Sequence, residues 1–319
     1  MKKKIFITGA SGFLGSNLIL QSVNKGYEVI GLINNRKPPD YIKDISFKKI
    51  IGDISLIHKF ENELNNCHSI IHTAAKFNND SNIEKINIDA TIALYKAAIK
   101  KRVKQFIYIS TRGTIGISGD RFLSDEDSTN FENIEYSDNY IKTKIIAEKE
   151  IIKLSKNSST KLLILCPTAI IGPNDLSPTP IGWLINHFNH KRLIFFIDGY
   201  INLVDVRDIA ELCVQIMEKT PVAGKYGIGN TNIAISNLID LIKSKKNKKY
   251  VKIPINYKFA LFISLVINKF LRFGKFVELI DPYRILRLKE GYSCFNSQKA
   301  KNEISLKCRN IVETINDTI

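Results

Sequence analysis

The chain lacks three features that would each have set its class. Its five cysteines are scattered and form no Cys-x-x-Cys pair, so a disulfide framework is not expected. It has no apolar run of about 20 residues, the length that a membrane-spanning helix needs. The apolar residues after Lys2-Lys3-Lys4 stop at Ile7, so a secretion signal is not expected either. We therefore expect a cytoplasmic protein.

Acidic residues are also few, with 31 against 47 lysines and arginines, which gives a net charge of +16. A surplus of this size can indicate a nucleic-acid partner. The lysines are mostly spread along the chain rather than gathered in a patch, so nucleic-acid binding is not expected. With 319 residues, 44% of them hydrophobic, the chain is long enough to bury a large core.

One dense basic cluster covers residues 243–249, Lys-Ser-Lys-Lys-Asn-Lys-Lys. It precedes an apolar stretch, residues 259–267, that Asn268 and Lys269 interrupt before it could span a bilayer. A core helix, or a helix that covers a lobe, is the first interpretation of this stretch. The second is a weak peripheral contact of residues 243–273 with a membrane, in which the lysines meet anionic headgroups.

Three glycines follow directly on the apolar residues 5–7. A strand that breaks at glycine and restarts as a helix directs backbone N–H groups and the positive end of the helix at one point, which binds phosphate. Such a turn predicts a nucleotide cofactor, although Gly-rich turns also occur only to close loops. The candidate cofactor-binding residues of this turn are Gly9, Ser11, Gly12, Phe13, Leu14 and Gly15.

Apolar runs of strand length alternate with helical patterns through the first half of the chain. The runs cover residues 5–7, 29–33, 47–51, 70–72, 106–110 and 162–165. This alternation predicts an α/β fold with a doubly wound parallel sheet, helices on both faces, and ligands at the carboxyl edge. We predict a dinucleotide-binding domain over residues 1–165. Residues 166–319 are expected to form mainly a smaller substrate-binding lobe, with about 201–230 returning to the sheet.

Tyr140 and Lys144 are four residues apart, on one face of a predicted helix. A tyrosine that exchanges a proton near neutral pH needs its pKa of about 10 lowered by about three units, or about 4 kcal/mol. One cation about 4 Å away supplies about that much at an effective dielectric near 20. A chain this rich in lysine contains about one such pair by chance. The position of the pair is more informative, because it follows a strand that ends in Ser110-Thr111.

Six motifs in order resemble those of the extended short-chain dehydrogenase/reductases, the NAD-dependent epimerase/dehydratase superfamily. They lie at residues 8–15, 52–54, 72–75, 108–111, 140–144 and 171–175. The resemblance implies a Rossmann fold in which Tyr140 is the catalytic acid/base and Lys144 lowers its pKa and binds the ribose. By the same resemblance, Thr111 would hold the substrate carbonyl. It also implies cofactor contacts at Asp53 and Ile54 (adenine), Ala74, Ala75 and Asn87 (along the cofactor) and Pro167 (nicotinamide).

The later segments, residues 166–175, 202–210 and 224–230, are similar to the dihydroflavonol-reductase-like branch, which reduces ketones or aldehydes with NADPH. A nucleotide-sugar epimerase or dehydratase is the alternative. Two positions differ from what such enzymes usually carry. Nucleotide-sugar epimerases usually have an arginine where this chain has Ile201, and the dehydratases have an acidic pair where this chain has Arg112-Gly113. A third interpretation is a non-catalytic regulator that binds NADP(H). The presence of Thr111, Tyr140 and Lys144 together argues against it.

The end of the second strand distinguishes NAD from NADP. NAD-specific sites usually place a carboxylate there, whereas this chain reads Asn34-Asn35-Arg36-Lys37. Asn34, Arg36 and Lys37 therefore favour NADP(H), with NAD(H) as the alternative. The expected partners are a small-molecule ketone or alcohol and, as is common in this family, a second copy of the chain. No metal is expected, because His187 and His190 have no third ligand near them.

Overall fold

The computed structural model describes most of the chain. The described residues are 2–34, 37–77, 81–116, 125–126, 139–176, 179–245, 249–270 and 293–319.

A parallel sheet of seven strands is the centre of the described structure, in the order β10-β6-β5-β4-β1-β2-β3. Every neighbouring pair in it is parallel. Its strands are β1 (Lys4–Thr8), β2 (Glu28–Ile33), β3 (Lys48–Ile51), β4 (Cys67–His72), β5 (Gln105–Ile109), β6 (Lys161–Pro167) and β10 (Gly224–Ile228). Each apolar run of the first half coincides with one of the first six, so the predicted doubly wound sheet is confirmed.

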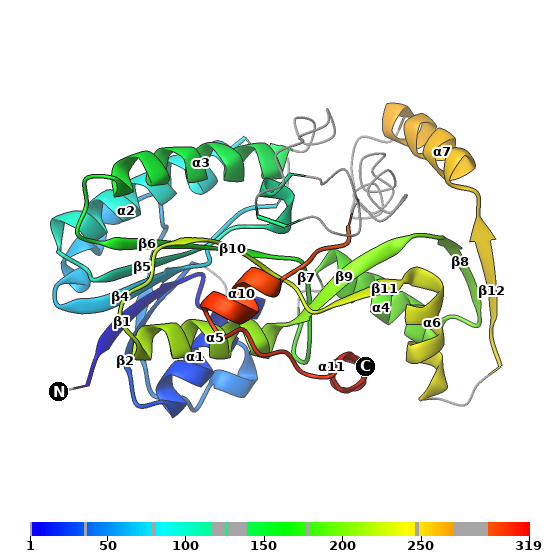
Figure 1. The fold of residues 1–319 in the computed structure, drawn as a ribbon, viewed down its shortest axis with the longest axis horizontal. Helices are drawn as coiled ribbons and strands as arrows, with labels where there is room; N and C mark the ends of the chain where they lie inside the picture. The colour runs from blue at the N-terminus through cyan, green and yellow to red at the C-terminus, as the bar shows by residue number, and fades with distance from the viewer. Residues whose placement is uncertain are drawn as a thin grey trace.

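Helices cover both faces of this sheet (Figure 1). On one face lie α1 (Phe13–Asn24) and α5 (Val206–Glu218), and on the other α2 (Ala90–Lys100) and α3 (Asn139–Ser155). Neighbouring side chains of β1 point to opposite faces, so that Ile5 and Ile7 join one core and Phe6 the other, all of them fully buried. A strand buried on both sides must be apolar throughout, which explains the unbroken runs in the sequence.

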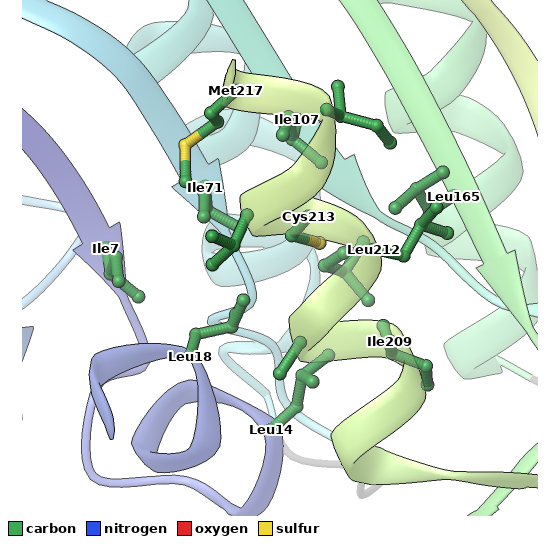
Figure 2. Packing of buried hydrophobic residues seen from close by; sticks show 14 of the residues in the cluster. Ile7, Leu14, Leu18, Ile71, Ile107, Leu165, Ile209, Leu212, Cys213 and Met217 are labelled. Carbon is green, nitrogen blue, oxygen red and sulfur yellow. The ribbon is translucent and has the colours of Figure 1, made fainter. Parts of the chain in front are cut away.

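The α5 helix brings a later part of the chain back to this sheet. Its apolar residues recur at spacings of three and four, which places them on the face that meets α1 and the strands. Figure 2 shows this packing, formed by Leu14, Leu18, Ile209, Leu212, Cys213 and Met217 of the helices and Ile7, Ile71, Ile107 and Leu165 of the strands. Both α5 and β10 thus pack with the first part of the chain. The division at residue 165 remains a prediction.

Several of the remaining elements pack around a separate apolar core, whereas α10 (Gln298–Glu303) joins the core of the large sheet through Ala300. One three-stranded sheet contains β7 (Ala169–Ile171), β9 (Tyr200–Asp205) and β11 (Thr231–Ala234), and a pair is formed by β8 (Leu193–Ile197) and β12 (Val251–Ile255). The helices are α4 (Pro180–His190), α6 (Ile235–Ser244), α7 (Tyr257–Phe270), α10 (Gln298–Glu303) and α11 (Ile311–Thr318). None of the helices in the described residues has the length and apolar character to cross a bilayer.

Short helical turns connect these elements. They are η1 (Asp40–Ile42), η2 (Ile57–Lys59), η3 (Glu61–Leu64), the π-helical η4 (Lys85–Asp89) and η5 (Arg112–Thr114).

Candidate active site

The candidate residues gather at one edge of the seven-stranded sheet. Because all its strands are parallel, their carboxyl ends meet there, at the edge where ligands of such sheets bind. The residues that end or follow the strands are, from one side to the other, Asp53 and Ile54 after β3, Asn34 after β2, the glycine turn (residues 9–15) after β1, Ala74 and Ala75 after β4, Thr111 after β5, and Pro167 at the end of β6.

Two glycines of the turn are required by the packing of the protein itself. Gly9 has a φ of +67°, and a Cβ added there would lie 2.6 Å from Thr73 Oγ1. A Cβ on Gly15 would lie 2.0 Å from the carbonyl oxygen of Gly9, because the first turn of α1 presses against the end of β1. Neither position accepts a side chain without a shift of the backbone.

Gly12 differs from both, because the protein does not need a glycine there. Its φ is −82°, which any residue adopts, and an added Cβ would meet only Gly9 O, at 3.1 Å. As the N-cap of α1, Gly12 also offers no side chain to the first N–H groups of that helix. A helix start without a side-chain cap leaves its first N–H groups for an anion, so the turn fits a pyrophosphate.

Tyr140 and Lys144 lie on the first turns of α3, beside the end of β5. The Lys144 side chain is 2% exposed, and its Nζ donates a hydrogen bond to Ile109 O at 2.9 Å. The same Nζ lies 5.9 Å from the centre of the Tyr140 ring and 4.5 Å from that of Tyr108. Thr111 follows two residues after Ile109. Its Oγ1 accepts from Gly113 N at 3.3 Å, so the spacing of Tyr140 and Lys144 brings both of them to the end of the strand that carries Thr111.

Two opposing effects determine the pKa of Lys144. Burial lowers its pKa to about 8, while the Glu148 carboxylate and, to a smaller extent, Cys166 act to raise it. The ammonium form therefore predominates at neutral pH. The ring of Phe77 packs against the Tyr140 ring, with 4.6 Å between the ring centres.

Glu148 is one of two residues near the site to which sequence analysis gave no role. It is 4% exposed and lies one helical turn after Lys144. Its Oε1 accepts hydrogen bonds from Ser110 Oγ and, at 2.6 Å, from Thr114 Oγ1, and its Oε2 accepts from Lys225 Nζ of β10 at 2.7 Å. Helical spacing from Lys144 was the available signal, but Lys225 lies far along the chain.

His72 joins β1 to β4 below the glycine turn, and sequence analysis gave it no role. Its Nδ1 lies 2.7 Å from Thr8 Oγ1 and its Nε2 lies 2.9 Å from Thr91 Oγ1. Thr8 Oγ1 also accepts from Ala74 N at 3.2 Å. Burial, reinforced by the Lys144 charge, lowers the His72 pKa to about 3. The imidazole is therefore neutral and links the carboxyl ends of the neighbouring strands β1 and β4.

Asn87 connects the loop after β4 to α3. Its Nδ2 donates to Lys76 O at 2.9 Å and to Thr143 Oγ1 at 3.0 Å, and its Oδ1 accepts from Lys76 N at 2.8 Å. Asn87 is 1% exposed. These contacts hold the backbone of the loop against the helix that carries Tyr140, whereas a contact of Asn87 with the cofactor remains a prediction.

The other predicted residues have these places. Ser11, Leu14, Ile54 and Pro167 are buried, Phe13, Asp53, Ala74 and Ala75 are half-buried, and Asn34 and Lys37 are exposed. The Asp53 carboxylate accepts from Ser55 N at 2.8 Å. Arg36 lies outside the described residues. Their cofactor roles remain predictions. Among the residues that the structure describes, no group of three or more His, Cys, Asp or Glu is placed to hold a metal ion.

The sequence pattern of the NAD dependent epimerase/dehydratase family matches residues 5–229. The chain belongs to this family. A dihydroflavonol 4-reductase from Callistephus chinensis is 22% identical over 76% of this chain and 72% of its own length. A UDP-glucose 4-epimerase from Vibrio cholerae is 31% identical over 64% of this chain and 66% of its own.

Solved structures share the fold along the whole chain. The crystal structure of gox2253 has a TM-score of 0.84 at 24% identity, covering 99% of this chain and 97% of the other. The Bordetella bronchiseptica enzyme WbmG in complex with NAD and UDP has a TM-score of 0.76 at 17% identity, covering 100% and 94%. The family confirms the predicted resemblance and an NAD(P)-dependent enzyme, and its members act on small-molecule substrates. Both reductases and epimerases are among its relatives.

Proposed function

We propose that this epimerase/dehydratase family member is an NADP(H)-dependent oxidoreductase that transfers hydride between the nicotinamide and the carbonyl carbon of a ketone, or the reverse from a secondary alcohol. The observation that carries the proposal is the buried Lys144 ammonium beside the Tyr140 ring at the end of β5. A buried cation next to a phenol has a direct use in proton transfer, and it costs stability otherwise.

Each catalytic residue then has one task. Bound NADP(H) supplies or accepts the hydride. Tyr140 donates a proton to the carbonyl oxygen during reduction and removes it during oxidation. Lys144 stabilises the phenolate of Tyr140, an interaction that is stronger in this buried place than it would be in water. The Thr111 hydroxyl donates a hydrogen bond to the substrate oxygen, and the glycine turn holds the pyrophosphate.

NADP(H) is proposed as the cofactor because of the residues after β2. Residues 34–37 contain no carboxylate that could bind a ribose diol and contain two cations, Arg36 and Lys37, that suit a 2′-phosphate. Lys37 is exposed just beyond the strand, next to the sheet edge where the adenosine half would lie.

A nucleotide-sugar epimerase or dehydratase is the second candidate, favoured by the identity to the Vibrio cholerae epimerase. Such an enzyme would use the same three residues but retain its cofactor through the cycle. Two features weigh against it. Ile201 lies on β9, paired with Ile233, where the epimerases usually have an arginine. Arg112 donates to Ile115 O at 2.7 Å and lies over the Phe295 ring, where dehydratases have an acidic pair.

The decisive experiment measures net NADPH oxidation with a panel of ketones and aldehydes, beside incubations with UDP-sugars. We expect stoichiometric consumption of NADPH with at least one carbonyl substrate. Interconversion of a UDP-sugar without net change in NADPH would favour the second candidate. Tight NADPH binding without turnover on any substrate would instead favour a non-catalytic regulator.

Three finer expectations accompany this proposal. We propose a cytoplasmic location, because the five scattered free cysteines suit a reducing compartment, and assembly as a homodimer, as is common in this family. A weak contact with membranes is the third. Subcellular fractionation and sedimentation velocity at micromolar concentration test the first two directly.

A further inference from the structure

Exposed apolar side chains are concentrated at one end of the molecule. Of the fifteen large hydrophobic residues exposed in the described part of the chain, nine lie within residues 193–195 and 251–266. These nine, which we call the β8–β12–α7 surface, are Leu193, Phe195, Val251, Ile253, Phe259, Phe262, Ile263, Leu265 and Val266. Figure 1 shows β8, β12 and α7 at the end of the molecule opposite the seven-stranded sheet. A gathering of this kind marks an interaction surface.

The two-stranded part of the surface is an apolar ladder. Leu193 of β8 lies opposite Val251 of β12, and Phe195 lies opposite Ile253. All four side chains are between 38% and 58% exposed. The alternate residues point the other way, because Lys252 forms an ion pair with Asp240 of α6. The ladder therefore faces away from α6 and from the core behind it.

The helical part reverses the usual pattern of a surface helix. Ala260 and Ser264 form the buried side of α7. The opposite side carries Phe259, Phe262 and Val266, which are 59%, 64% and 41% exposed and recur at spacings of three and four. A helix on the surface of a globular protein normally turns polar residues to water. The outward face of α7 therefore needs an apolar partner.

Cations surround this apolar surface. Lys191 and Arg192 precede β8, Lys249 precedes β12, and Lys258 lies on α7, all of them exposed. Val251 N donates to Arg192 O at 2.8 Å, which places these charges at the start of the ladder. Residues 191–198 and 249–266 contain one acid, Asp198. The partner is therefore negatively charged at its surface and apolar beneath it.

We propose that the β8–β12–α7 surface docks on an anionic lipid bilayer, with its apolar side chains in the interface and its cations on the headgroups. A second copy of this chain is a poorer partner at this surface, since each copy would bring the same exposed cations, Lys191, Arg192, Lys249 and Lys258. The helix is too short and too interrupted to span the bilayer, so the contact is peripheral.

The cations of this surface are mostly not those of the basic cluster in the sequence. Lys243 is buried and its Nζ donates to Asn189 O and Lys191 O at the end of α4, so it cannot meet lipid. Lys245 Nζ donates to Asn316 O at 2.6 Å. Of the cluster, Lys249 alone joins the proposed surface among the described residues. The membrane contact of residues 243–273 remains a prediction, and the contact that we propose does not include Lys243.

Vesicle flotation of the full chain tests the proposal. Vesicles of phosphatidylglycerol and phosphatidylcholine in equal parts are compared with phosphatidylcholine alone, at about 20 mM and about 500 mM salt. We expect binding to the anionic vesicles at low salt and release at high salt. We expect Val266→Glu and Phe262→Glu to lower the partition coefficient at least about tenfold, because each places a carboxylate in the interface.

Val312→Glu is the matched control, since Val312 is a helical valine of α11 that is 44% exposed, against 41% for Val266. Thermal melting of each variant verifies that it is folded. The proposal is overturned if the wild-type chain does not float with anionic vesicles at low salt, or if Val312→Glu loses as much binding as Val266→Glu. Sedimentation velocity tests a second copy of the chain as the partner. If the wild-type chain is a dimer that Phe262→Glu dissociates, and it does not bind vesicles, the surface serves self-association and the proposal is wrong.

Discussion

The chemistry proposed for single residues depends on the charge of Lys144. The ammonium keeps its proton in a buried place because the Ile109 carbonyl, the face of the Tyr108 ring and the Glu148 carboxylate all favour the positive form. Glu148 in turn is held by Ser110, Thr114 and Lys225. We regard Glu148 as a positioning residue, because it acts on the reaction through Lys144.

Replacing Glu148 with Gln should change the pH dependence of the reaction. Loss of the carboxylate removes a charge that raises the Lys144 pKa, so this pKa should fall below its value of about 8. The alkaline fall in kcat/KM for NADPH should then begin about one pH unit lower than in the wild-type enzyme. A profile from pH 6 to 10 at saturating carbonyl substrate measures this shift.

Glu150→Gln is the control for this experiment, because Glu150 lies on the same helix but is exposed. Its profile should coincide with that of the wild-type enzyme. An unchanged profile in Glu148→Gln, or a shift toward higher pH, would contradict the role assigned to Glu148.

Arg36 is predicted to select the cofactor. Arg36→Ala should reduce kcat/KM for NADPH by about tenfold to a hundredfold, the loss of about 1.4–2.7 kcal/mol that a charge-assisted hydrogen bond provides. The value for NADH should change by less than about threefold. Steady-state kinetics with both cofactors decide the matter, and equal losses would refute the NADP assignment.

Some of these residues could be predicted from the sequence and others could not. Tyr140 and Lys144 could be predicted as neighbours, because one helical turn separates them and the spacing alone places them on one face. The partners of His72 and Glu148 were not, because Thr8 and Lys225 lie more than sixty residues from them along the chain. Only the pairing of strands brings such groups together.

At the scale of elements, the glycine turn offers a test in which two similar substitutions should have opposite effects. Gly12→Ala adds a methyl group whose one close neighbour would be Gly9 O, at 3.1 Å, so the free energy of unfolding should change by less than about 1 kcal/mol. The same methyl would occupy the place of the pyrophosphate, so the Kd for NADPH should rise at least about tenfold.

Gly15→Ala should instead lower the free energy of unfolding, because its methyl would lie 2.0 Å from Gly9 O. We expect a loss of about 2 kcal/mol or more in urea unfolding. NADPH titration by fluorescence and urea melts of both variants provide the comparison. Tight NADPH binding by a folded Gly12→Ala variant would show that the dinucleotide does not lie against this turn.

The strands of the large sheet were predictable because burial on both faces leaves an unbroken apolar run in each. The same reasoning does not extend to β8, whose five residues, Leu-Ile-Phe-Phe-Ile, are equally unbroken although Leu193 and Phe195 are exposed. An apolar run in the sequence therefore does not tell whether a strand is buried in a core or exposed at a surface. The basic cluster shows the opposite case, since Lys243 is buried and donates to a backbone carbonyl at the end of α4.

At the scale of the whole molecule, the buried His72 links stability to pH. Its pKa is about 3 in the folded chain and about 6.5 when unfolded. The unfolded chain therefore binds more protons between these values, and stability falls as the pH drops below about 6.5. From pH 7.5 to 4.5 this single group should cost about 2–3 kcal/mol of the free energy of unfolding.

His72→Asn isolates this contribution from that of the carboxylates. The variant should be less stable at pH 7.5, because it disturbs the hydrogen bonds to Thr8 and Thr91. The difference in free energy of unfolding between the wild-type chain and the variant should become about 2 kcal/mol smaller at pH 4.5 than at pH 7.5, as measured by urea unfolding. The exposed His190→Asn serves as the control. A deficit that does not vary with pH would contradict a neutral, buried His72.

The account as a whole requires that one dinucleotide extends along the carboxyl edge, from Asn34 across the glycine turn to Tyr140. A crystal structure of the protein with NADP⁺ tests this most directly. We expect the pyrophosphate on the N–H groups after Gly12, and the nicotinamide beside β5 and β6 with its ring within about 5 Å of both Tyr140 Oη and Thr111 Oγ1. A dinucleotide bound elsewhere, or a nicotinamide out of reach of these two hydroxyls, would contradict the proposed oxidoreductase.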